Sequence, residues 1–344
     1  MVNRVAALVG KGKIEMTVGP VPEPKADEVL IKVRHCGVCG SDVHNFLEGR
    51  TGKRVISYPF VLGHEFAGDV VALGADVTNV QVGDRVCVEP GAACGHCEYC
   101  RIGRYNLCEH MRFLSAYPNV GSMQDYVVFP ARNCFKLPDN LDTIDGAMIE
   151  PLAVGLHAAN RGNVKWGDTV LIIGSGCIGI MTVLACKAKN ATNIIAVDVF
   201  DNRLAKAKEL GATATINSRT EDVAARVAEL TGGRLADVVF ECAGRPETFN
   251  MACDAVRPGG AIVTEGNISE PLQMNHVLIN MKEIDIKCMF RYVNVYPVAL
   301  RLISSGEINI KGLQPKIFPF DKTPEAFDCA INDGKSVLKC VLEM

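Results

Sequence analysis

The spacing of hydrophobic positions changes along this chain of 344 residues. Up to residue 150, short apolar runs such as Val29–Val33 alternate with turns, which is typical of β-strands. The next part alternates strand-like apolar runs with helical segments, and the last part returns to short strands. The pattern therefore predicts a discontinuous β-rich domain over 1–150 and 286–344, interrupted by an α/β domain over 151–285.

The most informative stretch runs from Thr169 to Lys187. The apolar residues at 170–173 predict a strand buried on both faces, and an apolar helix follows over 180–187. Glycines at G-x-G-x-x-G spacing would provide a tight turn, close approach of the backbone to a pyrophosphate, and helix–strand packing; they are Gly174, Gly176 and Gly179. An uncharged run of this length could also span a membrane, but the interrupting glycines and the lack of flanking anchors argue against a span.

The following segments support a dinucleotide-binding fold. The next apolar run ends at Asp198, 24 positions after Gly174, which is typical of an acid that binds ribose hydroxyls. Further strands are expected at 237–240 and 261–264, alternating with helices as in a doubly wound sheet. Arg203 could pair with the 2′-phosphate of NADP or pack against the adenine and ribose of NAD. Because Asp198 would repel a 2′-phosphate, the sequence favours NAD.

Composition narrows the classes of function. The net charge is −3 and no basic cluster occurs, so a nucleic acid is not expected as a partner. The N-terminus lacks a cleavable hydrophobic core, and no membrane partner is expected. Fifteen cysteines in a chain without a leader predict a reducing, cytoplasmic location, where cysteines bind metal rather than form disulfides.

Four cysteines at C-x2-C-x2-C-x7-C spacing predict a structural zinc site; they are Cys94, Cys97, Cys100 and Cys108. Four thiolates within fifteen residues suit a closed tetrahedral shell that stabilises a loop. An iron–sulfur cluster is the main alternative, but its usual cysteine spacings differ. His96, which lies between two of these cysteines, is expected to be a solvated loop residue.

A second metal site is predicted from Cys39, His64 and Glu65. A thiolate, an imidazole and a carboxylate with one open position suit catalytic zinc, which needs three protein ligands and an exchangeable water. Each residue alone says little, since a buried cysteine is commonly inert and a single histidine is commonly a hydrogen-bonded core residue. Together with the four-cysteine site and the dinucleotide fold, the three residues are a strong signal for catalytic zinc.

Several motifs resemble the zinc-dependent medium-chain dehydrogenases. Besides the cysteine lobe and the glycine fingerprint, these are Gly37–His44 and Gly63–Glu65. Within that superfamily, further segments resemble the sorbitol (L-iditol 2-) dehydrogenases and other polyol dehydrogenases: Val88–Gly91, Gly103–Leu107, Lys136–Asn140, Ile149–Leu152 and Phe290–Tyr292. The resemblance implies a GroES-like catalytic domain with a Rossmann domain. It also implies a homotetramer that interconverts a polyol (sorbitol, L-iditol or xylitol) and a ketose with NAD(H).

The resemblance also implies roles for single residues. Zinc would be held by Cys39, His64 and Glu65, with Glu150 coordinating directly or through a water. Ser41 and His44 would relay the proton, and Asp42 would orient the metal site from behind it. The substrate would contact Phe113, Glu150, Arg291 and Tyr292. NAD would contact Gly174, Gly176, Ile178, Gly179, Asp198, Arg203, Gly266 and Phe290.

One departure leaves the substrate open, because this chain has Asn45 where the animal polyol dehydrogenases have a tyrosine. Another secondary alcohol, such as butanediol, threonine or a sugar phosphate, would use the same chemistry. A catalytically silent dinucleotide-binding protein is a further alternative. The joint presence of Cys39, His64, Glu65 and Glu150 argues against it.

Overall fold

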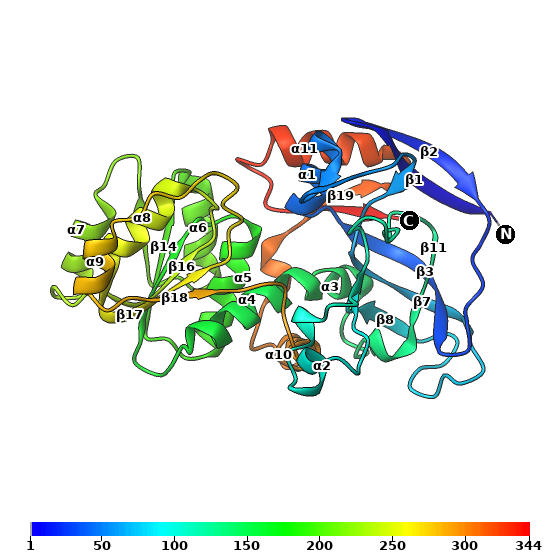
Figure 1. Cartoon of the computed structure of the whole chain (residues 1–344), viewed down its shortest axis with the longest axis horizontal. Helices are drawn as coiled ribbons and strands as arrows, with labels where there is room; N and C mark the ends of the chain where they lie inside the picture. Colours follow the sequence, from blue (N-terminus) through cyan, green and yellow to red (C-terminus); the bar gives the residue numbers. More distant parts are fainter. Residues whose placement is uncertain (1) are drawn as a thin grey trace. The chain divides into compact units, whose positions relative to one another are not determined.

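The computed structural model describes residues 2–344, and these residues form two compact units that are described separately below (Figure 1). The first unit comprises the chain up to Glu150 together with Tyr296–Ser304 and Leu313–Met344. The second unit comprises Pro151–Val295 and Ser305–Gly312. This division differs from the sequence expectation, which ended the second domain at residue 285. One physical reason is that the strand at Asp285–Cys288 pairs within the sheet of the second unit.

The first unit is rich in short strands. Its strands are β1 (Asn3–Gly10), β2 (Lys13–Gly19), β3 (Glu28–Gly37), β4 (Arg50–Thr51), β5 (Arg54–Val55), β6 (Phe60–Val61), β7 (Glu65–Leu73), β8 (Arg85–Val88), β9 (Gly91–Ala92), β10 (Arg112–Phe113), β11 (Tyr126–Pro130), β12 (Cys134–Lys136), β19 (Lys316–Pro319) and β20 (Cys340–Glu343). Its helices are α1 (Gly40–Glu48), α2 (Glu98–Arg101), α3 (Thr143–Ala147), α10 (Tyr296–Ser304) and α11 (Thr323–Asn332), with 3-10 turns η1 (Tyr105–Leu107), η2 (Ala131–Asn133) and η4 (Phe320–Lys322).

The longest strand, β3, organises this unit. It lies inside a seven-stranded sheet of order β12-β8-β7-β3-β20-β19, in which β11 also pairs with β3. One edge of β3 pairs with β7 along most of its length. The other edge pairs with β11 through Glu28–Lys32 and with β20 through His35–Gly37. The carboxyl end of β3 is therefore held on both sides.

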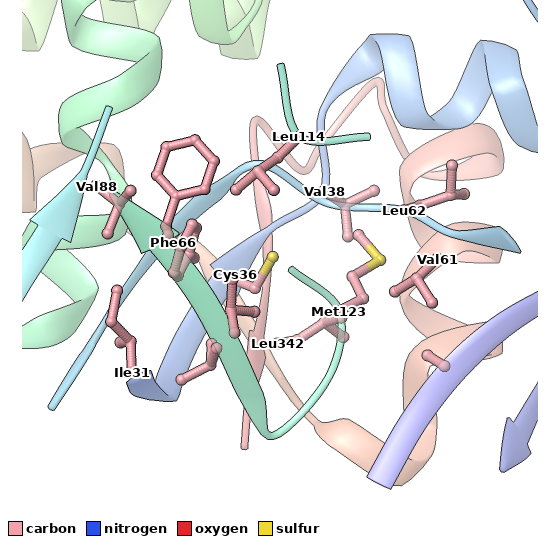
Figure 2. Packing of buried hydrophobic residues seen from close by; sticks show 14 of the residues in the cluster. Ile31, Cys36, Val38, Val61, Leu62, Phe66, Val88, Leu114, Met123 and Leu342 are labelled. Atoms are coloured by element: carbon pink, nitrogen blue, oxygen red, sulfur yellow. The ribbon is translucent and has the colours of Figure 1, made fainter. Parts of the chain in front are cut away.

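The core of the first unit joins residues that are far apart in the sequence. Figure 2 shows Ile31 of β3, Phe66 of β7 and Leu342 of β20 within one cluster of buried side chains. Met123 and Leu114, from the segment before β11, belong to the same cluster. Burial of this apolar surface holds the ends of β3 and β7 in place, and the candidate metal ligands follow or begin these two strands.

The second unit is a doubly wound sheet. Its strands are β13 (Thr169–Ile173), β14 (Asn193–Asp198), β15 (Ala214–Asn217), β16 (Ala236–Glu241), β17 (Val256–Thr264) and β18 (Asp285–Cys288). Its helices are α4 (Ile149–Gly162), which begins in the first unit, α5 (Cys177–Ala188), α6 (Asp201–Leu210), α7 (Val223–Leu230), α8 (Pro246–Ala255) and α9 (His276–Met281), followed by the turn η3 (Ile310–Leu313). All pairings are parallel in the order β15-β14-β13-β16-β17-β18.

This strand order confirms the predicted Rossmann-type sheet of the second unit, and the first unit is rich in β-strands as predicted. The chain builds the sheet outward from β13 in one direction and then, from β16 on, in the other. In sheets of this kind a dinucleotide binds outside the carboxyl ends of the strands at the point between these two halves. No helix within residues 2–344 is long and apolar enough to cross a membrane.

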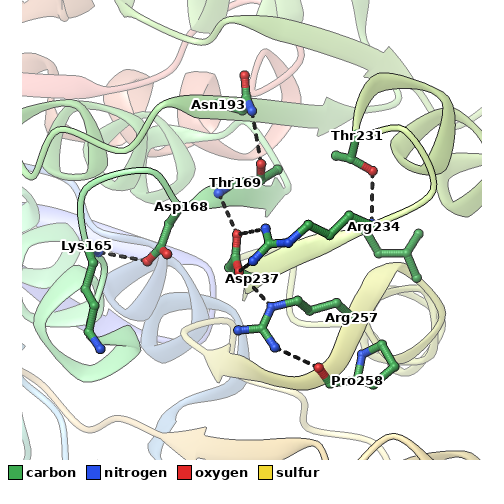
Figure 3. A network of polar contacts seen from close by, with 10 residues as sticks. Lys165, Asp168, Thr169, Asn193, Thr231, Arg234, Asp237, Arg257 and Pro258 are labelled. Carbon is green, nitrogen blue, oxygen red and sulfur yellow. Dashed lines mark hydrogen bonds and ion pairs between the residues drawn. The ribbon is translucent and has the colours of Figure 1, made fainter.

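A polar network stabilises the opposite end of this sheet (Figure 3). The Asp237 carboxylate accepts hydrogen bonds from the Thr169 amide at 2.9 Å and from both terminal nitrogens of Arg234 at 2.7 Å. Arg257 Nε donates to the same carboxylate at 2.7 Å. Although burial opposes ionisation, these donors lower the pKa of Asp237 to about 2.

We expect Asp237→Asn to lower the free energy of unfolding at pH 7 by about 1–2 kcal/mol. The pKa of Asp237 is lower in the folded chain, so its contribution is complete above the ordinary value of 3.8 and is lost as the pH falls toward about 2. Denaturant unfolding at pH 7 and near pH 2 measures this difference. The matched control is Asp285→Asn, because that carboxylate is exposed. An equal effect of the two substitutions at pH 7 would contradict the prediction.

Candidate active site

Three candidate metal ligands converge where β3 ends and β7 begins. Cys39 follows β3 and is the N-cap residue of α1, whereas His64 and Glu65 stand at the start of β7. The pairing of Gly37 with Glu65 brings these two chain segments together. The ligand atoms of Cys39, His64 and Glu65 all lie within 4.8 Å of one another.

The Glu65 carboxylate occupies a tight, charged environment. Gly37 leaves room for it, because a Cβ at residue 37 would lie 2.2 Å from Glu65 Oε2. The ammonium group of Lys339 forms an ion pair with Glu65, and both side chains are buried. Lys339 immediately precedes β20, whose Val341 pairs with Gly37. No local pattern in the sequence marks Lys339, because only this long-range strand pairing brings it to the cluster.

Asp42 lies behind the histidine. Its Oδ1 atom is 3.5 Å from His64 Nδ1, which leaves Nε2 as the nitrogen available to a metal. The carboxylate also accepts hydrogen bonds from the amides of Gly63 at 3.1 Å and Cys39 at 3.2 Å. Although burial opposes both charges, Asp42 and Cys39 raise the pKa of His64, while His64 and its neighbours lower the pKa of Asp42.

The segment at residues 113–115 contacts the same histidine from another direction. The ring of Phe113 lies 5.6 Å from the ring of His64. The Ser115 hydroxyl donates to Asp42 Oδ1 at 2.7 Å. Asn45, noted above as a departure from the animal enzymes, is buried and donates to the Ser115 carbonyl at 3.3 Å. Neither Asn45 nor Ser115 was predicted to have this role, since their contact joins segments 70 residues apart.

The four-cysteine lobe lies between β9 and β10, which pair with each other at its base. The sulfur atoms of Cys94, Cys97, Cys100 and Cys108 lie within 4.8 Å of one another. Backbone hydrogen bonds, led by the one from His96, lower the pKa of Cys94 to about 6, which favours the thiolate that a metal binds. His96 is exposed, and its ring stacks on that of His110.

Both clusters fit zinc by the chemistry of their donors. Four thiols in a compact group match a closed tetrahedral shell. One thiol, one imidazole and one carboxylate match a shell with an open position, and Asp42 supplies the outer partner that metal-bound histidines commonly have. Among residues 2–344, no further cluster of three or more such ligands is found.

The remaining predicted residues of the first unit lie on helices α1 and α4. Ser41 and His44 are exposed on α1, and His44 Nδ1 is 3.7 Å from Glu48. Glu150 is buried at the start of α4, outside the group of three ligands. Burial, aided by the charge of Glu150, raises the pKa of a further carboxyl, that of Glu89, to about 7 even though the Tyr105 hydroxyl donates to it.

The predicted residues of the second unit follow the carboxyl ends of several strands, beginning with β18 and β17. Phe290 is exposed with the Arg291 guanidinium 4.6 Å from its ring centre, and Tyr292 is buried. These three residues follow β18, the last strand of the sheet. Gly266 lies after β17, where an added Cβ would be 2.2 Å from the Gly244 amide nitrogen.

The glycine loop joins β13 to α5. Gly174 directly follows β13, Gly176 is the N-cap residue of α5, and Ile178 and Gly179 lie in its first turn. This geometry directs the free amides of the α5 N-terminus toward the end of the sheet where a dinucleotide pyrophosphate binds in this fold.

Asp198 ends β14 and is tied to the same loop. Its Oδ2 atom accepts a hydrogen bond from the Ser175 amide at 2.8 Å, and its Oδ1 atom accepts from the amides of Val199 and Phe200. The Arg203 guanidinium is 3.4 Å from Asp198 and lies over the ring of Phe200. The carboxylate therefore orders the glycine loop.

Comparison with known proteins extends this description. Residues 25–139 match the family described as alcohol dehydrogenase GroES-like domain, and residues 177–305 match the family described as zinc-binding dehydrogenase. The chain is 39% identical to sorbitol dehydrogenase of Bacillus subtilis (strain 168), over 98% of this chain and 96% of that protein.

Solved structures share the whole fold. An oxidoreductase/dehydrogenase of unknown specificity from Escherichia coli has 42% identity and a TM-score of 0.97, covering 100% of this chain and 99% of its own. A candidate zinc-binding dehydrogenase of Sinorhizobium meliloti 1021, bound to NADP, has 30% identity and a TM-score of 0.90, covering 100% of both chains. An alcohol dehydrogenase of Escherichia coli CFT073, complexed with NADH, has 32% identity and a TM-score of 0.92, covering 100% of this chain and 99% of its own.

Proposed function

We propose that this chain, which belongs to the zinc-dependent medium-chain dehydrogenases close to the polyol dehydrogenases, transfers hydride between NAD(H) and a polyol/ketose pair of the sorbitol, L-iditol or xylitol type. The observation that carries the proposal is the convergence of Cys39, His64 and Glu65 within 4.8 Å of one another. A catalytic zinc at this group and a structural zinc at the four cysteines complete the proposal, and the family resemblance supports a homotetramer.

The chain's own residues orient the metal ligands, balance their charge and carry the released proton to solvent. When bound, zinc supplies a Lewis acid and the nicotinamide supplies a hydride acceptor. The Asp42 carboxylate faces His64 Nδ1 at 3.5 Å and orients the ring electrostatically, and the Lys339 ammonium pairs with Glu65. Oxidation of a hydroxyl to a ketone releases one hydride to NAD⁺ and one proton. Ser41 and His44, which are exposed on α1, pass this proton to solvent.

The Glu150 carboxylate favours a substrate with several hydroxyls. Glu150 is buried in the first unit, and its charge helps to raise the pKa of Glu89 to about 7. We assign Glu150 to the open side of the metal group, either as a ligand or through a water. There it would accept a hydrogen bond from a hydroxyl next to the reacting one. Phe113, Arg291 and Tyr292 are the remaining contacts proposed for the polyol.

The cofactor proposed is NAD. The Asp198 side chain ends β14, and repulsion between a carboxylate there and a 2′-phosphate a few ångströms away costs roughly 1–4 kcal/mol. Arg203 already faces Asp198 and Phe200, an arrangement suited to packing beside an adenine and ribose. The glycine loop, Gly266 and Phe290 complete the cofactor contacts proposed.

A steady-state screen tests the function. Sorbitol, xylitol, 2,3-butanediol, threonine, a sugar-alcohol phosphate and ethanol are each assayed with NAD and with NADP. We expect kcat/KM for the best polyol to exceed that for ethanol by roughly 10³-fold, because a site built to bind several hydroxyls rejects substrates that lack them. We expect NAD to be preferred over NADP by at least about tenfold.

Other outcomes of the screen separate the parts of the proposal. A preference for butanediol, threonine or the phosphate would retain the zinc chemistry and replace the substrate class. Equal kcat/KM with NAD and NADP would refute the role of Asp198. Ethanol oxidised as well as sorbitol and xylitol would refute the polyol site, and no oxidation of any alcohol by the zinc-loaded protein would refute the enzyme assignment.

A further inference from the structure

Ser115 adopts a costly backbone conformation beside the candidate metal centre. Its φ angle is 63°, in the left-handed region that non-glycine residues seldom occupy, and the residue is buried. Such a conformation persists only where the surroundings hold it. In this chain both polar ends of Ser115 are held, because its hydroxyl donates to Asp42 and its carbonyl accepts from Asn45.

Both partners of Ser115 come from helix α1. Asp42 and Asn45 are three residues apart, so they lie on the same face of that helix, and both are buried. The Asn45 amide is itself oriented, since Thr51 Oγ1 donates to Asn45 Oδ1 at 3.3 Å. Ser115 thus joins two successive turns of α1 through two different groups.

The hydroxyl contact is directed at one oxygen of Asp42. Oδ1 receives the Ser115 hydroxyl at 2.7 Å and faces His64 Nδ1 at 3.5 Å. The amides of Gly63 and Cys39 are longer donors to the carboxylate, at 3.1 and 3.2 Å. Because Ser115 is the shortest of these contacts, loss of its hydroxyl would allow the carboxylate, and with it the imidazole, to turn.

We propose that Ser115 and Asn45 form a positioning clamp, which holds Asp42 and through it the His64 ring in the orientation that binds the catalytic zinc. Neither Ser115 nor Asn45 belongs to the group of metal ligands, and the contacts above connect the clamp to that group through Asp42. The clamp therefore acts on metal affinity through Asp42 rather than on the substrate. The inference rests on the proposed function only for the identity of the metal.

The test compares Ser115→Ala, Ser115→Gly and Asn45→Ala with the unchanged chain. The zinc-loaded proteins are mixed with a chromogenic chelator, and zinc release from each site is followed. We expect release from the Cys39–His64–Glu65 site to require roughly tenfold less chelator in Ser115→Ala and Ser115→Gly. The four-cysteine site is an internal reference and should be unchanged. Cobalt substitution should give an altered visible spectrum at the first site only.

Two features of the design exclude a general loss of stability. Glycine accepts the φ angle of Ser115, so Ser115→Gly removes the hydroxyl while relieving the backbone, and its melting temperature is not expected to fall with the metal affinity. The matched control is Ser57→Ala, which removes an exposed serine hydroxyl that accepts from Tyr117. In the double variant Asn45→Ala/Ser115→Ala, the losses of zinc affinity caused by the two single substitutions should not add, because Asn45 acts through Ser115.

The outcomes separate this inference from the proposed function. If the unchanged chain binds zinc at the first site and all three variants match it in affinity and cobalt spectrum, the clamp is overturned and the proposed function stands. Additive effects of Asn45→Ala and Ser115→Ala would also overturn it. If the unchanged chain binds no zinc at Cys39, His64 and Glu65, the proposed function and the clamp are both overturned, because the clamp is proposed to hold His64 for that metal.

Discussion

Removing zinc from the Cys39–His64–Glu65 site is expected to abolish turnover while the four-cysteine lobe keeps its metal. A shell of three protein ligands with an open position exchanges its metal more readily than a closed shell of four thiolates. Loss of the Lewis acid should lower kcat by roughly 10³-fold or more, since its contribution to the reaction is several kcal/mol. Metal content and activity are measured together before and after mild chelation, and activity should return when zinc is added.

Single substitutions make the same test without a chelator. His64→Ala should lose zinc at one site of two, together with activity. His110→Ala is the matched control, because His110 is exposed beside the four-cysteine lobe and contributes no ligand atom to either cluster. Activity that survives complete removal of the metal from the first site would rule out the zinc mechanism.

Replacing two glycines of the dinucleotide loop by alanine is expected to have different effects, one on the stability of the fold and the other on cofactor binding. A Cβ at Gly179 would lie 1.8 Å from the Gly174 carbonyl oxygen, which is backbone and has little freedom to move. Gly179→Ala should therefore lower the free energy of unfolding by more than about 3 kcal/mol. A Cβ at Gly176 would meet only Arg203 Nη1, at 3.9 Å, so Gly176→Ala should leave the folded chain as stable as before.

Binding of NADH further distinguishes the role of Gly176 from that of Gly179. In the cofactor site proposed above, the backbone approaches the pyrophosphate at Gly176, so the stable variant Gly176→Ala should bind NADH at least about tenfold more weakly. Thermal unfolding and fluorescence titration with NADH give the two quantities for each variant. A destabilised Gly176→Ala, or one that binds NADH as well as the unchanged chain, would contradict the assignment of this loop.

The parts of the site that the sequence could predict are those encoded over short stretches. The glycine fingerprint, the cysteine lobe and the His64–Glu65 pair each lie within about twenty residues, where spacing has a direct physical meaning. The doubly wound sheet was predictable for the same reason, because each strand and helix carries its own periodicity.

What the sequence could not show depends on pairing between distant segments. Lys339 reaches Glu65 through the pairing of β20 with β3, and no local pattern marks a buried lysine near the end of the chain. Ser115 reaches Asp42 across 73 residues. The second unit extends beyond the expected boundary at residue 285, which the sequence could not show because β18 is mostly exposed and lacks the continuous apolar run of an inner strand.

The shared edge of β3 also has a consequence for the order of events during synthesis. Most of the second unit is one continuous stretch, Pro151–Val295, and its sheet is complete when that stretch has been made. In the first unit, the carboxyl end of β3 pairs with β20 (Cys340–Glu343), which is synthesised after the whole of that stretch. Until β20 has been made, β3 has an uncovered strand edge close to Cys39, and Lys339 cannot yet contact Glu65. The unit that begins first is therefore the last to close, and the surroundings of its candidate metal site are completed only after the second unit has been synthesised.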